Sequence, residues 1–251
     1  MRMGRTEHVN GIDLHYEVEG EGEPLLLLHG FTGCSANWAH VFETSPRGYE
    51  LVMPDLRGHG WSSGFDGPFT FRQAAADLLA LLDRLGIGRV CAIGLSGGGQ
   101  ALLHMATREP DRLEAMVLVS TAPCFPEPAR RQMRSMTVES RTEEDWRLMR
   151  QWHRHGDDQI RSLWRHASAM QHSVDDVNFT GAELAGITAR TLIVHGDRDP
   201  LYPVEIATGL FAAIPNSYLW IVPNGGHEPI FGSHAAPFGS TALDFLRGQW
   251  A

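Results

Sequence analysis

The stretch that decides the fold is residues 89–108, which reads RVCAIGLSGGGQALLHMATR. The apolar letters at its start form a run typical of a buried strand, and the letters after the glycines have the composition of a helix. Between the two lies the pattern Gly94-x-Ser96-x-Gly98. A serine at a sharp strand-to-helix turn projects its hydroxyl above the edge of a sheet, and flanking glycines let the turn close without side-chain clashes. The stretch therefore predicts that Ser96 is a nucleophile.

The same Gly-x-Ser-x-Gly pattern also occurs at residues 60–64, GWSSG, with Ser62 at its centre. The flanking residues 56–59 and 65–68 have neither the apolar run of a strand nor the periodicity of a helix. The pattern by itself is weak, since a chain of this composition gives roughly 0.1–0.2 matches by chance. The flanks make Ser62 a predicted loop residue and leave Ser96 as the candidate nucleophile. The alternative interpretation of the stretch around Ser96 is an ordinary glycine-rich turn.

Outward from this stretch, short apolar runs alternate with helix-like segments over most of the chain. That alternation is typical of a mostly parallel sheet covered by helices on both faces. An amphipathic helix is expected at residues 70–85, with Thr70 as its N-cap and Gly86 after its end. The expected strands are residues 12–18, 24–29, 50–54, 89–95, 115–120, 190–195 and 217–222. The other expected helices are residues 97–108, 204–214 and 240–247.

The alternation breaks between residues 122 and 186. Prolines open this segment, no β-like run follows them, and residues 160–167 carry apolar side chains at helical spacing. We expect an all-helical insertion that forms a cap between strands of the sheet. The predicted organisation is an α/β core made of residues 1–121 and 187–251, with residues 122–186 as the cap.

A serine hydroxyl is a poor nucleophile at neutral pH and needs a histidine base, oriented by a carboxylate. In a fold built on such a strand–serine–helix turn, the acid and the histidine follow the serine in the chain. Residues 195–199, HGDRD, follow one expected strand, and residues 225–227, GGH, follow the next. Both segments lie at carboxyl ends of strands, the edge where open α/β sheets place their sites. We therefore expect His227 to act as the base, with either Asp197 or Asp199 as its partner.

These segments together resemble the α/β-hydrolase superfamily, in particular its small cap-bearing esterases, lactonases and C–C hydrolases. The similarity spans residues 29–227, and the matching segments are His29-Gly30-Phe31, Asp55-Leu56-Arg57-Gly58-His59-Gly60, the serine turn, residues 195–199 and residues 225–227. The resemblance implies an α/β-hydrolase fold, with a mostly parallel central sheet flanked by helices and an inserted helical cap. It also implies the catalytic set Ser96, Asp199 and His227, with Asp197 as the less favoured acid.

The resemblance also assigns an oxyanion hole and a role for several histidines. It places the two backbone N–H donors at Phe31 and Gly97, and Gly97 opens a helix whose positive end favours an anion. His29, His59 and His195, which each precede a glycine, are then structural. Relatives often carry a larger residue where this chain has Gly97, so we expect open space beside the nucleophile.

The expected function is that of a carboxylesterase for small to medium, largely apolar esters. Serine at the turn argues against the haloalkane dehalogenases and epoxide hydrolases of this fold, which use aspartate there. Phe31 and the cap residues Trp146, Trp152 and Trp164 are expected to line the substrate pocket, although the tryptophans could equally hold the cap together. A lactonase, a C–C bond hydrolase or a perhydrolase would use the same triad, and a non-catalytic small-molecule receptor is the more distant alternative.

The bulk composition limits the classes of molecule that this protein is expected to bind. The 251 residues carry 21 Lys plus Arg against 30 Asp plus Glu, a net charge of −9, which makes nucleic acids and anionic membranes poor partners. Three widely spaced cysteines and the lack of an apolar leader lead us to expect a cytoplasmic protein. The pair His153-x-His155 lacks further metal ligands at a recognised spacing. We expect no cofactor and no metal, a small-molecule ester as ligand, and a monomer or small homo-oligomer.

Overall fold

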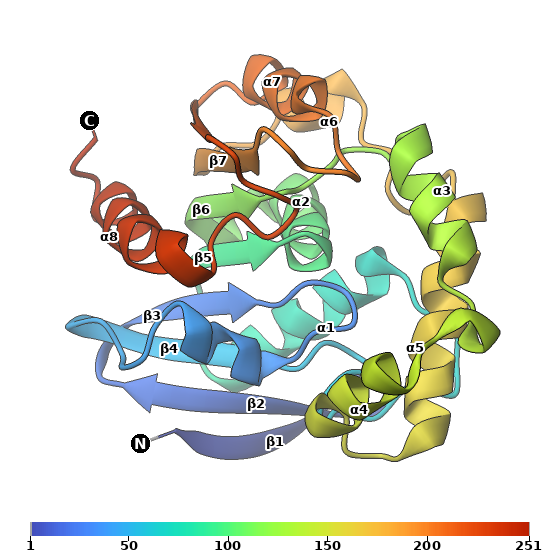
Figure 1. Ribbon diagram of the computed structural model, residues 1–251. Helices are drawn as coiled ribbons and strands as arrows, with labels where there is room; N and C mark the ends of the chain where they lie inside the picture. Colours follow the sequence, from blue (N-terminus) through green and yellow to red (C-terminus); the bar gives the residue numbers. More distant parts are fainter. Residues whose placement is uncertain (1, 251) are drawn as a thin grey trace.

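The computed structural model describes residues 2–250, and its centre is one sheet of eight strands in the order β1-β2-β4-β3-β5-β6-β7-β8 (Figure 1). β2 pairs antiparallel with β1 and β4, and all the other pairs are parallel. This mostly parallel sheet confirms the predicted α/β class. The strands are β1 Met3–Val9, β2 Ile12–Gly20, β3 Gly22–Leu28, β4 Gly48–Pro54, β5 Val90–Leu95, β6 Leu113–Val119, β7 Arg190–Gly196 and β8 Ser217–Val222.

The sequence analysis missed β1, the strand at one edge of the sheet. Most of its side chains are exposed, so it lacks the apolar alternation by which the other strands were found. It is joined to β2 by Asn10 and Gly11, both with positive φ. An Asn-Gly pair is the strongest short-range signal for a β-hairpin. This pair is the feature of the sequence from which β1 could have been found.

Helices cover both faces of the sheet, because side chains along a strand point alternately to opposite sides. Leu26 and Leu28 of β3 pack into the core on the side of α1, α2 and α7. Leu25 and Leu27 pack into the other core, which contains α8. The helices are α1 Phe71–Arg84, α2 Gly97–Arg108, α7 Val204–Ala213 and α8 Ala235–Leu246. All four were predicted, although α8 begins five residues before its expected start.

Between β6 and β7 the chain forms α3 Glu127–Ser135, α4 Glu143–Trp152, α5 Asp157–Ala169 and α6 Gly181–Ala185. In Figure 1, α3, α4 and α5 stand as a column at the edge toward which the arrows of β5 and β6 point. The chain returns to the start of this segment just before α6, since Cys124 forms an antiparallel bridge with Asn178 and the Phe179 N–H donates to the Pro123 carbonyl over 2.9 Å. We call residues 122–186 the cap segment. Its helices agree with the prediction, and its standing as a separate domain stays a prediction.

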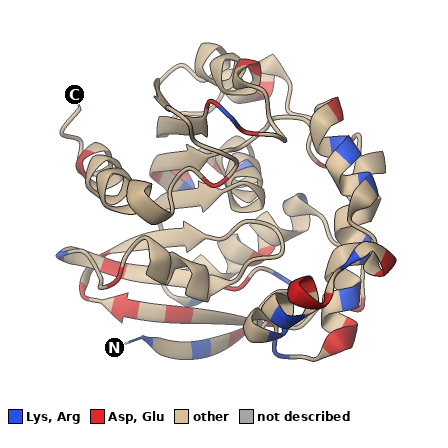
Figure 2. Ribbon diagram, in the orientation of Figure 1, with Lys and Arg blue, Asp and Glu red and all other residues tan. Residues whose placement is uncertain are grey.

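Residues of both charge signs alternate along the cap helices (Figure 2). Several form exposed ion pairs with near neighbours, such as Arg147 with Glu144 and Arg150 with Asp157. Exposed pairs contribute at most about 1 kcal/mol each. The cap is therefore held mainly by its own apolar cluster, whose buried members are Met149, Ile160, Leu163 and Trp164.

The predicted location of the protein stays a prediction. Within residues 2–250 the helices are too short or too polar for any of them to cross a bilayer.

Candidate active site

Ser96 lies at the turn between β5 and α2, where the sequence predicts it. Its backbone is in the left-handed region, with φ 49° and ψ −111°, which is strained for a residue with a side chain. A Cβ added to Gly94 would lie 2.7 Å from the backbone of Gly98, and one added to Gly98 would clash with the Leu28 carbonyl. The two glycines of the pattern are therefore required by the close approach of neighbouring backbone. They allow the strained turn that presents Ser96 to a cavity at the carboxyl ends of the parallel strands.

His227 and Asp199 meet Ser96 at this edge. The Ser96 hydroxyl lies 2.9 Å from His227 Nε2, and His227 Nδ1 lies 2.8 Å from Asp199 Oδ2. A carboxylate accepts only, so Nδ1 carries the proton and Nε2 is free to accept the serine proton. The arrangement can therefore remove the serine proton and stabilise the imidazolium that results.

The carboxylate of Asp199 is held ionised by its surroundings. Burial alone would raise the pKa of this carboxyl, but hydrogen bonds from His227 and from the backbone N–H groups of Leu201 and Tyr202 outweigh it and lower the pKa. Asp197, the alternative acid, instead lies 3.9 Å from Arg198. Of the two carboxylates that the sequence left open, the structure brings Asp199 to the histidine.

The backbone N–H groups of Phe31 and Gly97 lie beside the serine. A Cβ on Gly30 would be 3.6 Å from Ser96 Cβ, and a Cβ on Gly97 would be 3.1 Å from the Phe31 nitrogen. Within residues 2–250, neither N–H donates to a protein acceptor. Gly97 also begins α2, so the partial positive charge of that helix end adds to the two donors. The arrangement suits an oxygen that gains negative charge.

Three buried histidines hold the loop that carries Phe31. His59 Nε2 accepts from the Thr32 N–H at 3.2 Å, and His153 Nε2 donates to the Thr32 carbonyl at 3.1 Å. His29 Nδ1 donates to the Gly30 carbonyl at 2.8 Å. Burial lowers the pKa of all three imidazoles, that of His153 to about 4, so they stay neutral at physiological pH. Each neutral ring offers one donor and one acceptor, and the second nitrogen of each ring also binds a backbone group of the core.

The role of His153 was not found from the sequence. This residue follows α4 of the cap, and besides Thr32 it binds the Gly60 N–H, at 2.9 Å from Nδ1. His155 lies 2.9 Å from the Trp61 carbonyl. Both histidines therefore bind backbone groups of the core, and no described group of His, Cys, Asp and Glu is placed to hold a metal ion. The partners of His153 are too far away along the chain for any local pattern to predict them.

A cavity of about 400 Å³ opens onto Ser96 and His227. It is lined mainly by apolar and aromatic side chains from both the core and the cap, including Phe31, Phe71, Phe125, Met133, Met136 and Met170. A second cavity of about 440 Å³ adjoins it across the Gly30–Thr32 loop and is lined in part by Trp38, Trp152 and Phe231. The predicted pocket residue Phe31 lines both cavities.

The cap tryptophans depart from the prediction that they line the pocket beside Ser96. Trp146 and Trp164 pack edge to face, with ring centroids 4.5 Å apart, inside the apolar cluster of the cap. Trp152 lines only the second cavity. The composition of the cap suggested an apolar wall but could not tell whether these rings meet a pocket or one another, and Trp146 and Trp164 meet each other in the cap's own core.

The space that a side chain at position 97 would occupy is filled by a ring, which differs from the expectation that glycine there leaves it open. A Cβ added to Gly97 would lie 2.8 Å from Cε1 of the Phe71 ring. Phe71 is the first residue of α1 and is 1% exposed. The ring takes the room that a larger residue at position 97 would need, so glycine here accommodates Phe71.

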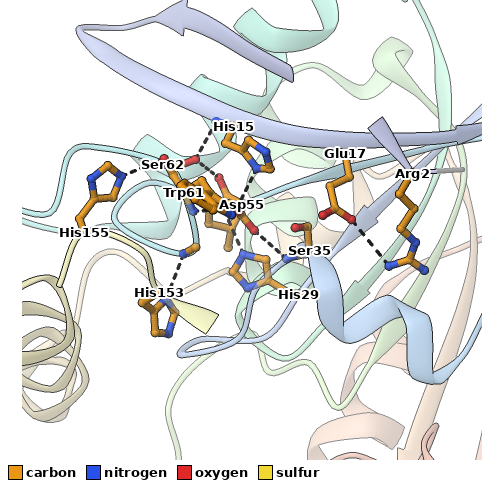
Figure 3. Close-up of polar contacts among 12 residues, drawn as sticks. Arg2, His15, Glu17, His29, Ser35, Asp55, Trp61, Ser62, His153 and His155 are labelled. Atoms are coloured by element: carbon orange, nitrogen blue, oxygen red, sulfur yellow. Dashed lines mark hydrogen bonds and ion pairs between the residues drawn. The ribbon is translucent and has the colours of Figure 1, made fainter. Parts of the chain in front are cut away.

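Ser62, the centre of the second Gly-x-Ser-x-Gly pattern, is a buried loop residue, as predicted. Figure 3 shows it close to His15 and Asp55. Its hydroxyl donates to the Asp55 carbonyl at 2.7 Å and accepts from the His15 N–H at 2.9 Å.

Comparison with known proteins finds relatives that agree with this fold. The sequence profile of a family described as "alpha/beta hydrolase fold" matches residues 23–147. A 2-hydroxy-6-oxononadienedioate/2-hydroxy-6-oxononatrienedioate hydrolase of Pseudomonas putida is 31% identical over 94% of this chain and 92% of that protein. A pimeloyl-[acyl-carrier protein] methyl ester esterase of Nitrosomonas europaea is 28% identical over 86% of this chain and 93% of that protein.

Solved structures agree. A thermophilic esterase from Thermogutta terrifontis superimposes with a TM-score of 0.78, at 25% identity and with 99% of this chain and 98% of that chain covered. An enol-lactonase from Burkholderia xenovorans gives a TM-score of 0.79 at 24% identity, covering 97% of this chain and 100% of that chain. The predicted α/β-hydrolase fold is confirmed by this likeness.

Proposed function

Because the chain belongs to the α/β-hydrolase family, we propose that it is a serine hydrolase that cleaves carboxylic esters of small to medium, largely apolar substrates. The observation that carries the proposal is the hydrogen-bonded line from Ser96 through His227 to Asp199, with distances of 2.9 and 2.8 Å. It lies beside two unpaired backbone N–H groups and opens onto an apolar cavity.

In the proposed reaction Ser96 Oγ attacks the ester carbonyl carbon while His227 Nε2 takes the serine proton. The carbonyl oxygen becomes an oxyanion and accepts hydrogen bonds from the N–H groups of Phe31 and Gly97. Each donor lowers the activation free energy by roughly 2.7–4 kcal/mol. The C–O bond then breaks, and the imidazolium gives its proton to the leaving alcohol. Water attacks the acyl-enzyme by the same route, which releases the carboxylic acid and restores Ser96.

The charges around the cavity support a substrate without carboxylates. Among the described residues that line it, the only carboxylate is Glu228, and none is an arginine. The chain also contains no lysine. The Pseudomonas putida relative is named for a dioate, a substrate with two carboxylates. An anion of that kind would meet Glu228 with no cation to balance its charge, whereas an apolar ester would not.

C–C bond hydrolysis remains the second candidate, since the 31% identical relative is named as a hydrolase of 2-hydroxy-6-oxo dioates, which are not esters. Lactonase and perhydrolase activities would use the same three residues. A panel of p-nitrophenyl esters, lactones, vinylogous diketones and peracid assays separates these reactions. A ligand receptor on the same fold would show thermal stabilisation by ligand without multiple turnover.

The test measures hydrolysis of p-nitrophenyl butyrate by the wild type and by Ser96→Ala, with Ser62→Ala as the matched control. We expect Ser96→Ala to lose a factor of about 10⁴ or more in kcat while folding normally, and Ser62→Ala to keep its activity. A fluorophosphonate probe, located by peptide mass spectrometry, should label Ser96. Equal turnover by Ser96→Ala and the wild type would sink the proposal.

A matched pair of substrates tests the charge argument. A p-nitrophenyl ester with a terminal carboxylate on its acyl chain should react several-fold more slowly than the neutral ester of equal length. Glu228→Gln should narrow that gap. A preference for the anionic ester would instead favour the dioate-type substrates.

A further inference from the structure

Tyr202 is tied to the proposed triad through its backbone. It lies in the loop between β7 and α7 and is 3% exposed. Its N–H donates to Asp199 Oδ1 at 3.1 Å, and its carbonyl accepts from His195 Nε2 at 2.8 Å. Its ring stands edge to face with that of His227, with centroids 5.2 Å apart. Contacts on three sides fix the position of the phenol.

The phenol oxygen of Tyr202 accepts a hydrogen bond from Gln100. The Gln100 side chain is 1% exposed and its Nε2 lies 3.0 Å from the phenol oxygen. Gln100 is one helical turn after the nucleophile, and its N–H donates to the Ser96 carbonyl at 3.0 Å. A side-chain amide nitrogen can only donate, so the phenol accepts here and its own O–H must point elsewhere.

Ser96 is the side chain best placed to receive that O–H. Besides the Gln100 amide, its hydroxyl is the polar side-chain group near enough to lower the pKa of the phenol, and Tyr202 and Ser96 line the same cavity. A serine hydroxyl has one proton and two lone pairs. With its proton directed to His227 Nε2, Ser96 Oγ has a lone pair free to accept from Tyr202. Ser96, His227 and Asp199 are thus joined by hydrogen bonds, and Tyr202 contacts both His227 and Asp199 and shares the cavity with Ser96.

We propose that Tyr202 is a positioning residue for Ser96: its O–H donates to Ser96 Oγ, which turns the serine proton toward His227, and Gln100 sets the direction of the phenol. The inference rests on the proposed serine mechanism and deepens it. Burial raises the pKa of Tyr202, so the phenol keeps its proton throughout the working range of pH. Tyr202 takes no proton in the reaction and acts through the orientation of the nucleophile.

The test compares Tyr202→Phe, Gln100→Met and the double variant with the wild type. Tyr202→Phe keeps the ring and removes one hydrogen bond, so kcat should fall about 3- to 10-fold with KM unchanged. The rate of labelling by a fluorophosphonate should fall by the same factor, and the loss should be constant between about pH 6 and pH 9 because the phenol does not titrate there. Gln100→Met should have a smaller effect of the same kind, and adding it to Tyr202→Phe should cost nothing further.

Tyr218→Phe serves as the control, since this phenol lies 3.4 Å from the Trp250 carbonyl, away from the cavity residues. It should leave kcat unchanged. If Tyr202→Phe labels and turns over as fast as the wild type, or loses only thermal stability, the positioning role is refuted. If the wild type itself neither hydrolyses esters nor reacts with the probe, the serine mechanism fails instead, so the two failures are told apart.

Discussion

Within residues 2–250, Ser96 and Ser62 each lie close to a His–Asp pair, and of these two sets only that of Ser96 has the arrangement of a catalytic triad. In the first, His227 Nδ1 lies 2.8 Å from Asp199; in the second, His15 Nδ1 lies 3.0 Å from Asp55. Each serine is the centre of a Gly-x-Ser-x-Gly pattern. The residue types and the His–Asp pairs are therefore the same in both places.

The two sets differ in where the serine proton goes. The Ser96 hydroxyl meets an imidazole nitrogen and a cavity, while the Ser62 hydroxyl donates a hydrogen bond to a backbone carbonyl and accepts one from a backbone N–H. Ser62 is also fully buried. Asp55 accepts from the N–H groups of Ser35 and Trp61 as well as from His15 (Figure 3). The second set ties loops together, and a hydroxyl used in this way has no base to activate it.

The comparison is tested most strongly by removing the negative charge at each aspartate. Asp199→Asn should lower kcat by about 10⁴-fold, because the amide favours the wrong histidine tautomer. Asp55→Asn should leave kcat of the folded protein within a few-fold of the wild type. Steady-state kinetics at matched concentrations of folded protein measure both. A comparable loss in the two variants would erase the distinction between the sets.

The second largest expected effect is a loss of folding stability in Asp55→Asn. Hydrogen bonds from His15 and from backbone N–H groups overcome the burial that would otherwise raise the pKa of Asp55, and they lower it. Replacing this buried charge by an amide should reduce the free energy of unfolding by about 3–4 kcal/mol, because an N–H donor would lose its acceptor. Urea denaturation gives the value. An unchanged midpoint would mean that Asp55 does not hold these loops.

Acid should weaken the loop contacts through the buried imidazoles. The pKa of His153 is about 4 in the folded protein against 6.5 ordinarily, so the unfolded chain binds more protons between these values. Stability is therefore fully present above about pH 6.5 and falls as the pH drops to about 4, by up to roughly 3 kcal/mol from this group. His153→Gln should lower proton uptake on unfolding by about one at pH 5. The same uptake in both proteins would count against a neutral, buried His153.

The smallest expected effect is that of Ser62→Ala. It leaves the Asp55 carbonyl and the His15 N–H without their shared partner, which should cost about 1–2 kcal/mol of stability. Thermal unfolding followed by circular dichroism measures this loss. Stability equal to that of the wild type would show that water replaces the hydroxyl at no cost.

The sequence predicted the parts of the molecule that repeat along the chain or follow a local pattern. Buried strands, the helices beside them and the turn at Ser96 all have such signals. The choice of Asp199 over Asp197 had no local signal and came only from the family resemblance, since both follow the same strand and the turn that folds Leu201 and Tyr202 back decides which carboxylate meets His227.

Packing between distant segments also could not be predicted. The hydrogen bonds of His153 to Gly60 and Thr32 join residues from the cap and two loops of the core. Trp146 and Trp164 lie on two different helices, α4 and α5, and the sequence does not show whether an apolar side chain on a helix meets a pocket or another helix. The position of Phe71 beside Gly97 depends in the same way on the packing of α1 against α2.

The hydrogen bond between Pro123 and Phe179, which brackets all of the cap segment except α6 and its flanking residues, has a consequence for evolution and for protein engineering. An insertion whose ends lie together can be exchanged for another of different length without rethreading its neighbouring strands. A chimaera could therefore carry the cap segment of another protein on this α/β core, provided that the new segment supplies a ring that binds the Thr32 carbonyl as His153 does.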